Sequence, residues 1–188
     1  ARRRGAGPVR KGAGTIQEKV KSFYEAHPYP RQRVEKESDL SESGHEKVMR
    51  QILRTVGVSP EWLAGKRILD GGCGTGEKAI YCALHGAKTD AFDFSKTSIR
   101  LARQSARNFR KNFSALELRT AVRNSNTTKR LKAKADFSVA DFESVKLRGN
   151  YDLILLIGTL HHTTDARANF MRMARHLAPG GRIALGLY

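Results

Sequence analysis

The sequence LDGGCGTG at residues 69–76 carries the strongest structural signal in this 188-residue chain. It follows a short apolar run and precedes an amphipathic pattern, so a strand, a glycine turn and a helix are predicted in that order. Glycines let the backbone approach a ligand closely, and the first N–H groups of a helix attract an anionic group. Asp93 closes the next apolar run, TDAFD, where an acid can hydrogen-bond ribose hydroxyls. Together these features predict a pocket for an adenosine-bearing ligand.

Two ligand classes fit these glycines. Gly74, Gly76 and Ala79 match the looser G-x-G-x-x-A fingerprint of dinucleotide binding, so an NAD-linked oxidoreductase stays open as an alternative. Asp70 extends the pattern to D-x-G-x-G-x-G. Three stretches then carry a family resemblance: the run from Ile68 to Ala102, YDLILLIGTLHHTTD at 151–165, and HLAPGGRIALGLY at 176–188. Through them the chain resembles the class I S-adenosylmethionine (SAM) dependent methyltransferases from Lys66 to Tyr188, apart from a poorly matching middle stretch.

The expected fold is α/β: a Rossmann-like, doubly wound and mostly parallel sheet with N-terminal helices. Strands are expected at 67–70, 88–92, 136–139, 151–157 and 182–187. We expect three parts: a disordered basic tail (1–14), a helical segment (15–65), and a SAM-binding core (66–188). The family's sheet adds an antiparallel pair after the fifth strand. The sheet therefore looks truncated, and we expect either an excerpt of a longer protein or an edge covered by a partner chain.

The resemblance implies a set of cofactor-binding residues beyond the carboxyl ends of the strands. Asp70 would reach the SAM ammonium, the glycine turn would accommodate the methionine part, and Asp93 would take the ribose hydroxyls. Asp141 would accept the adenine amino group between apolar walls, although it also reads as a loop cap. The implied set is Asp70, Gly72, Gly74, Gly76, Asp93, Phe94, Asp141, Phe142 and Ile157.

The candidate catalytic residues are His161 and His162, which follow the fourth predicted strand. A histidine can remove a proton from a methyl acceptor near neutral pH, because its unperturbed pKa is about 6.5. The alternative is that one ring only packs or orients the loop. No metal site is predicted, because adjacent histidines without a third ligand, and two cysteines nine residues apart, do not have metal-ligand spacing.

The sequence does not identify the molecule that accepts the methyl group, and two features of the sequence point to different acceptors. The motif GTLHHT replaces the N-P-P-Y type motif of relatives that methylate nucleobase amines, and it resembles small-molecule methyltransferases. Yet the net charge is +17, and residues 103–134 hold ten basic residues against one acidic residue. This basic segment and the tail are candidates for contact with RNA or a protein assembly. The alternative function is therefore a methyltransferase-like RNA-binding or assembly scaffold with weak or no turnover.

The N-terminal segment raises two further expectations. Thr15 and Glu18 form a capping box ahead of a helix, in which Phe23 is predicted to be a core residue. Tyr24 and Tyr29 are open between core packing and capping the cofactor pocket. No apolar run reaches membrane-spanning length, so no membrane contact is predicted. A cytoplasmic location is expected, with an organelle matrix as the alternative.

Overall fold

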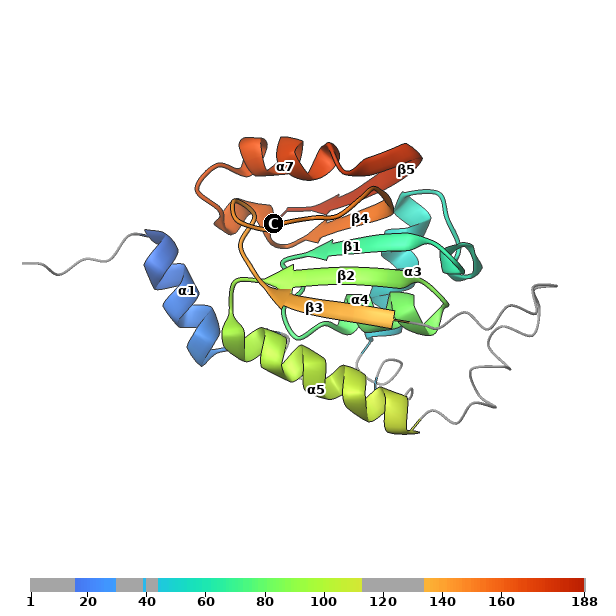
Figure 1. Cartoon of the computed structure of the whole chain (residues 1–188), viewed down its shortest axis with the longest axis horizontal. Coiled ribbons are helices and arrows are strands. Elements are labelled where there is room, and N and C mark those ends of the chain that lie inside the picture. Colours follow the sequence, from blue (N-terminus) through green and yellow to red (C-terminus); the bar gives the residue numbers. More distant parts are fainter. Residues whose placement is uncertain (1–15, 30–38, 40–43, 113–133, 188) are drawn as a thin grey trace, which may run out of the picture.

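The computed structural model describes residues 16–29, 39, 44–112 and 134–187. Its centre is one sheet of five strands in the order β3-β2-β1-β4-β5, and every neighbouring pair is parallel. The expected Rossmann-like α/β fold is thus confirmed (Figure 1). The strands are β1 (Arg67–Gly71), β2 (Lys88–Asp93), β3 (Lys134–Val139), β4 (Tyr151–Ile157) and β5 (Leu177–Gly186).

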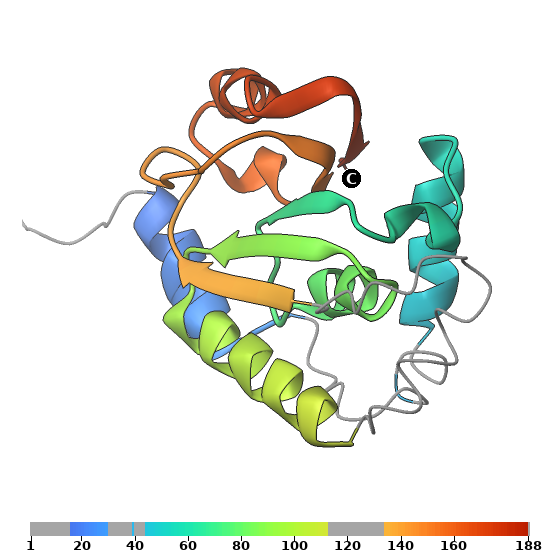
Figure 2. The same ribbon diagram turned by 45° about the vertical axis from the view of Figure 1, so that its right-hand side comes forward.

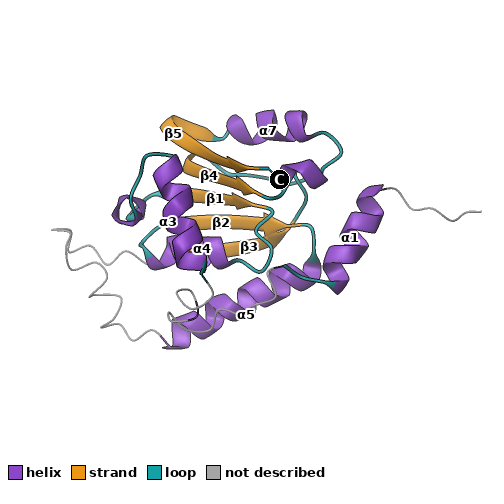
Figure 3. Ribbon diagram, turned by 180° about the vertical axis from the view of Figure 1, so that it is seen from behind, coloured by secondary structure: helices purple, strands orange, loops and turns teal. Residues whose placement is uncertain are grey.

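Helices cover both faces of the sheet. The α-helices are α1 (Ile16–Ala26), α3 (His45–Thr55), α4 (Glu77–Leu84), α5 (Lys96–Asn112) and α7 (Ala166–Ala174), with 3-10 turns η1 (Pro60–Leu63) and η2 (Leu160–His162). Seen from behind, α3 and α4 lie in front of the sheet (Figure 3). Figure 2 shows α5 beside β3 at one edge, and α7 beside β5 at the other.

The apolar alternation along the strands produces two core clusters, one on each face. Leu153 and Leu155 join the cluster that α3, α4 and α5 cover, while Ile154 and Leu156 join the cluster beneath α7. This is the period of two that a strand buried on both faces requires. Order reverses between β1 and β4, so the crevice for a ligand is expected beyond their carboxyl ends.

The fifth strand begins earlier than the sequence pattern predicts. It starts at Leu177 and not at Arg182, because Leu177 pairs with Tyr151 ahead of the Pro-Gly-Gly stretch. The Tyr151 N–H donates to the carbonyl of His176 at 2.8 Å. The register then shifts before Arg182 pairs with Leu153, so the turn-forming residues 178–181 interrupt the pairing without ending the strand.

The prediction that Phe23 is a core residue is wrong, because its side chain is 59% exposed. Helix α1 does not pack on the sheet. It lies beyond the carboxyl ends of the strands, next to the start of α5 (Figures 1 and 3). Phe23 stacks on His27, while Tyr24, the next residue, faces the domain.

Some expectations fall outside the described residues. These are the tail at 1–14, Thr15 of the capping box, and residues 113–133 of the basic segment. Among the described residues, no helix has the length and apolar character needed to cross a membrane.

Candidate active site

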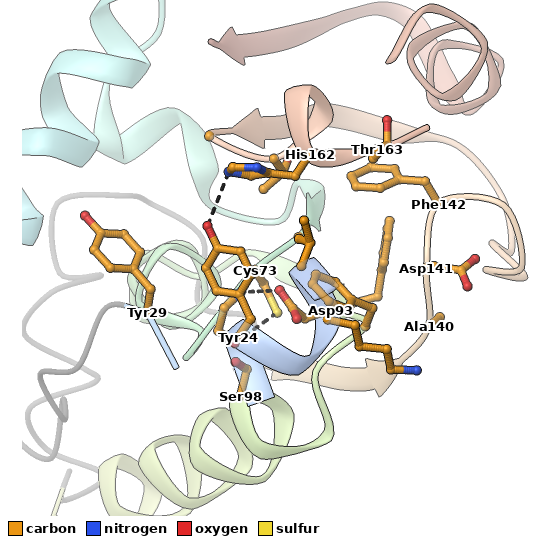
Figure 4. A pocket seen from close by; sticks show the side chains of 18 of the residues that line it. Tyr24, Tyr29, Cys73, Asp93, Ser98, Ala140, Asp141, Phe142, His162 and Thr163 are labelled. Atoms are coloured by element: carbon orange, nitrogen blue, oxygen red, sulfur yellow. Dashed lines mark hydrogen bonds between the residues drawn. The ribbon is translucent and has the colours of Figure 1, made fainter. Parts of the chain in front are cut away.

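A cavity of about 410 Å³ lies beyond the carboxyl ends of β1, β2 and β4. Most of the expected site residues meet there: Gly72, Gly74, Asp93, Phe94, Asp141, Phe142, Ile157 and His162 line it. Asp70, Gly76 and His161 do not. Tyr24 and Tyr29 also line the cavity (Figure 4). Lys78, Thr159, Thr163 and Asn169 are lining residues that the motifs do not reveal.

The glycines of the turn serve different purposes. Gly72 has a φ of +71°, and a Cβ on it would overlap the Thr159 side chain. Only glycine suits that position, which faces the cavity. A Cβ on Gly76 would instead meet the Phe137 ring at 2.7 Å and Ala102 at 2.9 Å. Gly76 therefore allows the start of α4 to pack against β3 and α5, and it is not among the residues that line the cavity.

Asp93 joins the glycine turn to the start of α5. Its Oδ2 accepts the Gly74 N–H at 2.9 Å, and its Oδ1 accepts the Ser95 N–H at 2.8 Å. Burial raises the pKa of Asp93, and these two backbone hydrogen bonds oppose the rise. The carboxylate thus shapes the turn as well as facing the cavity, where it retains further lone pairs for a ligand.

Asp70 lies behind the turn and is fully buried. Within the described residues, neither of its oxygens has a hydrogen-bond partner at bonding geometry. Burial raises the pKa of Asp70, and the positive charge of Lys78 opposes this. The pKa of Lys78 is raised overall. Burial lowers it, but the negative charges of Asp70 and Glu77 have the larger effect. Lys78 therefore remains a cation, and it lines the cavity.

Asp141 has the capping role that was its alternative reading. Its Oδ1 accepts the N–H groups of Glu143 at 3.0 Å and Ser144 at 2.7 Å. Burial raises the pKa of Asp141, but hydrogen bonds from Ser144 and Glu143 lower it overall. Figure 4 shows the carboxylate directed away from the cavity. Phe142, the next residue, is buried and forms an edge-to-face pair with Phe92.

His162 is the candidate base on the cavity wall. Its Nε2 lies 3.2 Å from the hydroxyl of Tyr24, which belongs to α1 (Figure 4). Burial and the neighbouring His161 both lower the pKa of His162 below its usual value. The imidazole is therefore neutral at pH 7. The His161 ring lies 4.0 Å from that of His162 and does not line the cavity, so its place suits an orienting role.

Glu77, at the start of α4, is expected to make the free energy of unfolding depend on pH. Burial raises its pKa to about 7, although Thr75 donates a hydrogen bond to Oε1. The folded state therefore keeps a proton that the unfolded state loses near pH 4.5, and stability falls as pH rises through this interval. Glu77→Gln is expected to be more stable than the original protein by up to about 3 kcal/mol above pH 7, and equal to it near pH 4.

Urea unfolding at several pH values measures this difference. Glu46→Gln is the control, because Glu46 forms an exposed ion pair with Arg50 on α3. A Glu77→Gln protein whose stability advantage does not grow with pH would show that Glu77 does not keep its proton.

Comparison with known proteins decides the family. A model of the methyltransferase domain matches residues 41–187. The chain belongs to this family. The resemblance found in the sequence motifs is thereby confirmed, and the match includes α3 as well as the sheet.

Individual relatives agree with this assignment. The chain is 30% identical over 150 residues to the O-methyltransferase resE of Aspergillus sclerotiorum, which covers 79% of this chain and 50% of resE. It is 31% identical over 129 residues to the SAM-dependent Diels-Alderase iccD of Talaromyces variabilis, covering 66% and 38% of the two chains. Among the first curated relatives, the chain spans 37% to 50% of their length.

A solved structure shows the same fold. Magnesium protoporphyrin IX methyltransferase of Synechocystis PCC 6803, with bound SAM, matches at a TM-score of 0.59 and 18% identity. The match covers 89% of this chain and 74% of that one. Among the described residues of this methyltransferase domain, no group of three or more His, Cys, Asp or Glu side chains is arranged to hold a metal ion.

Proposed function

We propose that this methyltransferase domain binds SAM and transfers its methyl group to a hydroxyl of a small molecule. The observation that carries the proposal is the pair formed by Tyr24 and His162 on the wall of the cavity, 3.2 Å apart. A neutral imidazole can accept a proton, and a hydroxyl acceptor becomes a good nucleophile only as it loses its proton. The O-methyltransferase resE among the relatives supports this acceptor class.

The residues present fit SAM. The cavity combines the carboxylate of Asp93, which we assign to the ribose hydroxyls, with apolar walls from Phe94 and Phe142. The glycine turn leaves room for the methionine part. Lys78 suits the methionine carboxylate, and we assign the buried Asp70 to the ammonium, through water. The sulfonium of SAM supplies an activated methyl group, so positioning is the main task left to the protein.

Tyr24 and His162 handle the proton. In the tautomer with its proton on Nδ1, His162 accepts from the Tyr24 hydroxyl, whose oxygen can accept from the substrate hydroxyl. As the substrate oxygen attacks, its proton passes to Tyr24 and that of Tyr24 passes to Nε2. His161, whose ring is tilted against that of His162, is proposed to orient the ring.

Methyl transfer from radiolabelled SAM to a panel of phenols, alcohols, amines and carboxylic acids tests the proposal. Labelled phenolic or alcoholic ethers are the expected products. Labelling confined to amines would contradict the acceptor class. Binding of SAM without transfer to any acceptor would favour a role like that named for iccD.

RNA contact through α5 and the basic segment 103–134 is a second proposal, supported by exposed Arg100 and Arg107 on α5. Arg103 is less free, because its guanidinium donates to the Phe137 carbonyl at 2.7 Å. If the surface binds RNA, the logarithm of the affinity is expected to fall linearly with the logarithm of the salt concentration. The double variant Arg100→Glu with Arg107→Glu should weaken binding further.

We also propose a cytoplasmic location for the protein.

A further inference from the structure

Helix α1 is joined to the domain at the first turn of α5. The first N–H groups of any α-helix have no acceptor within the helix. At α5, the Ser95 N–H donates to Asp93 and the Ser98 N–H donates to the Ser95 hydroxyl. The two N–H groups between them, of Lys96 and Thr97, donate to Glu25 of α1.

Glu25 holds these two groups with one oxygen each. The Lys96 N–H lies 2.7 Å from Oε1, and the Thr97 N–H lies 3.0 Å from Oε2. Although burial raises the pKa of Glu25, hydrogen bonds from Thr97, Lys96 and Ser95 lower it overall. A carboxylate at a helix N-terminus is favoured by the helix dipole and by charge-assisted hydrogen bonding. Two elements more than 70 residues apart in sequence are thereby held together.

Tyr24 precedes Glu25 on the same helix and reaches the candidate base. Its hydroxyl contacts His162, and its ring meets the edge of Phe94 at a centroid distance of 6.0 Å. A tyrosine–histidine hydrogen bond between neutral groups is the weaker of the two attachments, because hydrogen bonds to a charged group contribute about twice as much. The charged attachment at Glu25 therefore governs where Tyr24 lies.

We propose that Glu25 is a positioning residue for His162: by fixing α1 on the start of α5, it holds the Tyr24 hydroxyl against Nε2. The proposal rests on the proposed function only in taking His162 as the base. Asp93, the expected ribose ligand, caps the same turn of α5. The cofactor side and the base side of the cavity are thus built on one helix start.

Three variants separate the anchor from the contact it supports. Glu25→Ala removes both acceptors and is expected to release α1 and, with it, Tyr24. Tyr24→Phe removes the hydroxyl alone and leaves the anchor in place. Lys19→Ala is the control, because Lys19 is an exposed residue of α1 that does not line the cavity.

A fourth variant tests the anchor from the other side. Lys96 is the first residue of α5 after the N-cap Ser95, a position where proline is tolerated because its missing N–H has no helical partner. Lys96→Pro therefore removes one of the two donors to Glu25 while α5 keeps its start. It is expected to loosen α1 less than Glu25→Ala does, because the hydrogen bond from the Thr97 N–H to Glu25 remains.

Two NMR measurements test whether Glu25 positions Tyr24 against His162, and neither needs a cofactor or a methyl acceptor. In Glu25→Ala, amide exchange of α1 should accelerate at least tenfold, and the pKa of His162 should rise toward that of a free imidazole. Tyr24→Phe should change the His162 titration and accelerate α1 exchange far less than Glu25→Ala does, while Lys19→Ala should change neither readout. Protected β1 and β4 amides confirm that each variant is folded.

Unchanged His162 titration in Glu25→Ala and Lys96→Pro would overturn the proposal, whatever the exchange of α1 shows. Failure of the protein to bind SAM would refute the proposed function, but it would not affect the NMR test of Glu25.

Discussion

Replacing His162 with alanine is expected to lower the rate of methyl transfer about 100-fold or more, with little change in cofactor affinity. General base catalysis contributes roughly 10² to 10⁴ to a rate, and His162 is the imidazole that lines the cavity in the described residues. The rate constant kcat for the acceptor found in the labelling screen measures the loss. Added imidazole should restore part of it.

The rate of methyl transfer is also expected to depend on pH through the protonation of His162. Burial and His161 lower the pKa of His162, so the base is neutral and active above that lowered pKa. The rate constant of the original protein should rise with pH below about 6.5 and be level at neutral pH. His176→Ala is the matched control, because the His176 side chain, just before β5, does not line the cavity. If His162→Ala keeps the full rate and profile, another group removes the proton.

Replacing Asp93 with alanine is expected to weaken binding of S-adenosylhomocysteine more than tenfold. A hydrogen bond to a charged group contributes about 1.5 to 3 kcal/mol, and about 1.4 kcal/mol corresponds to a factor of ten. The substitution also frees the N–H groups of Gly74 and Ser95, so the glycine turn loses a support. Asp93→Asn should weaken binding too, because its amide places an N–H₂ group against one of these donors.

Calorimetric titration measures the affinity, with Asp136→Ala as the control. Asp136 is exposed and pairs with Lys134 on β3, away from the cavity. Equal affinities for the original protein and both Asp93 variants would place the ribose elsewhere.

The parts of the fold predicted well are those whose signal is local. The glycine turn and the acidic residue that ends the next strand lie close together in the sequence. Each is recognised from the residues next to it in the chain. The alternating faces of β4 follow from its unbroken apolar run. The start of β5 was missed because Pro179 and Gly180 are turn residues, and only pairing with Tyr151 extends the strand past them.

The parts predicted badly depend on tertiary placement. Periodicity showed that α1 is amphipathic but not which surface it covers, so Phe23 was assigned to the core when Tyr24 is the inward aromatic. Gly76 fits a cofactor motif, yet its missing side chain makes room for Phe137. Glu25 reaches α5 across 71 residues, and no spacing rule relates them.

Titration of the protein with S-adenosylhomocysteine, and separately with NAD⁺, distinguishes a methyltransferase cofactor pocket from a dinucleotide pocket. We expect one site per chain for S-adenosylhomocysteine, competition by SAM, and no binding of NAD⁺. Binding of NAD⁺ with none of S-adenosylhomocysteine would contradict this expectation, because the glycine turn and Asp93 would then serve a dinucleotide.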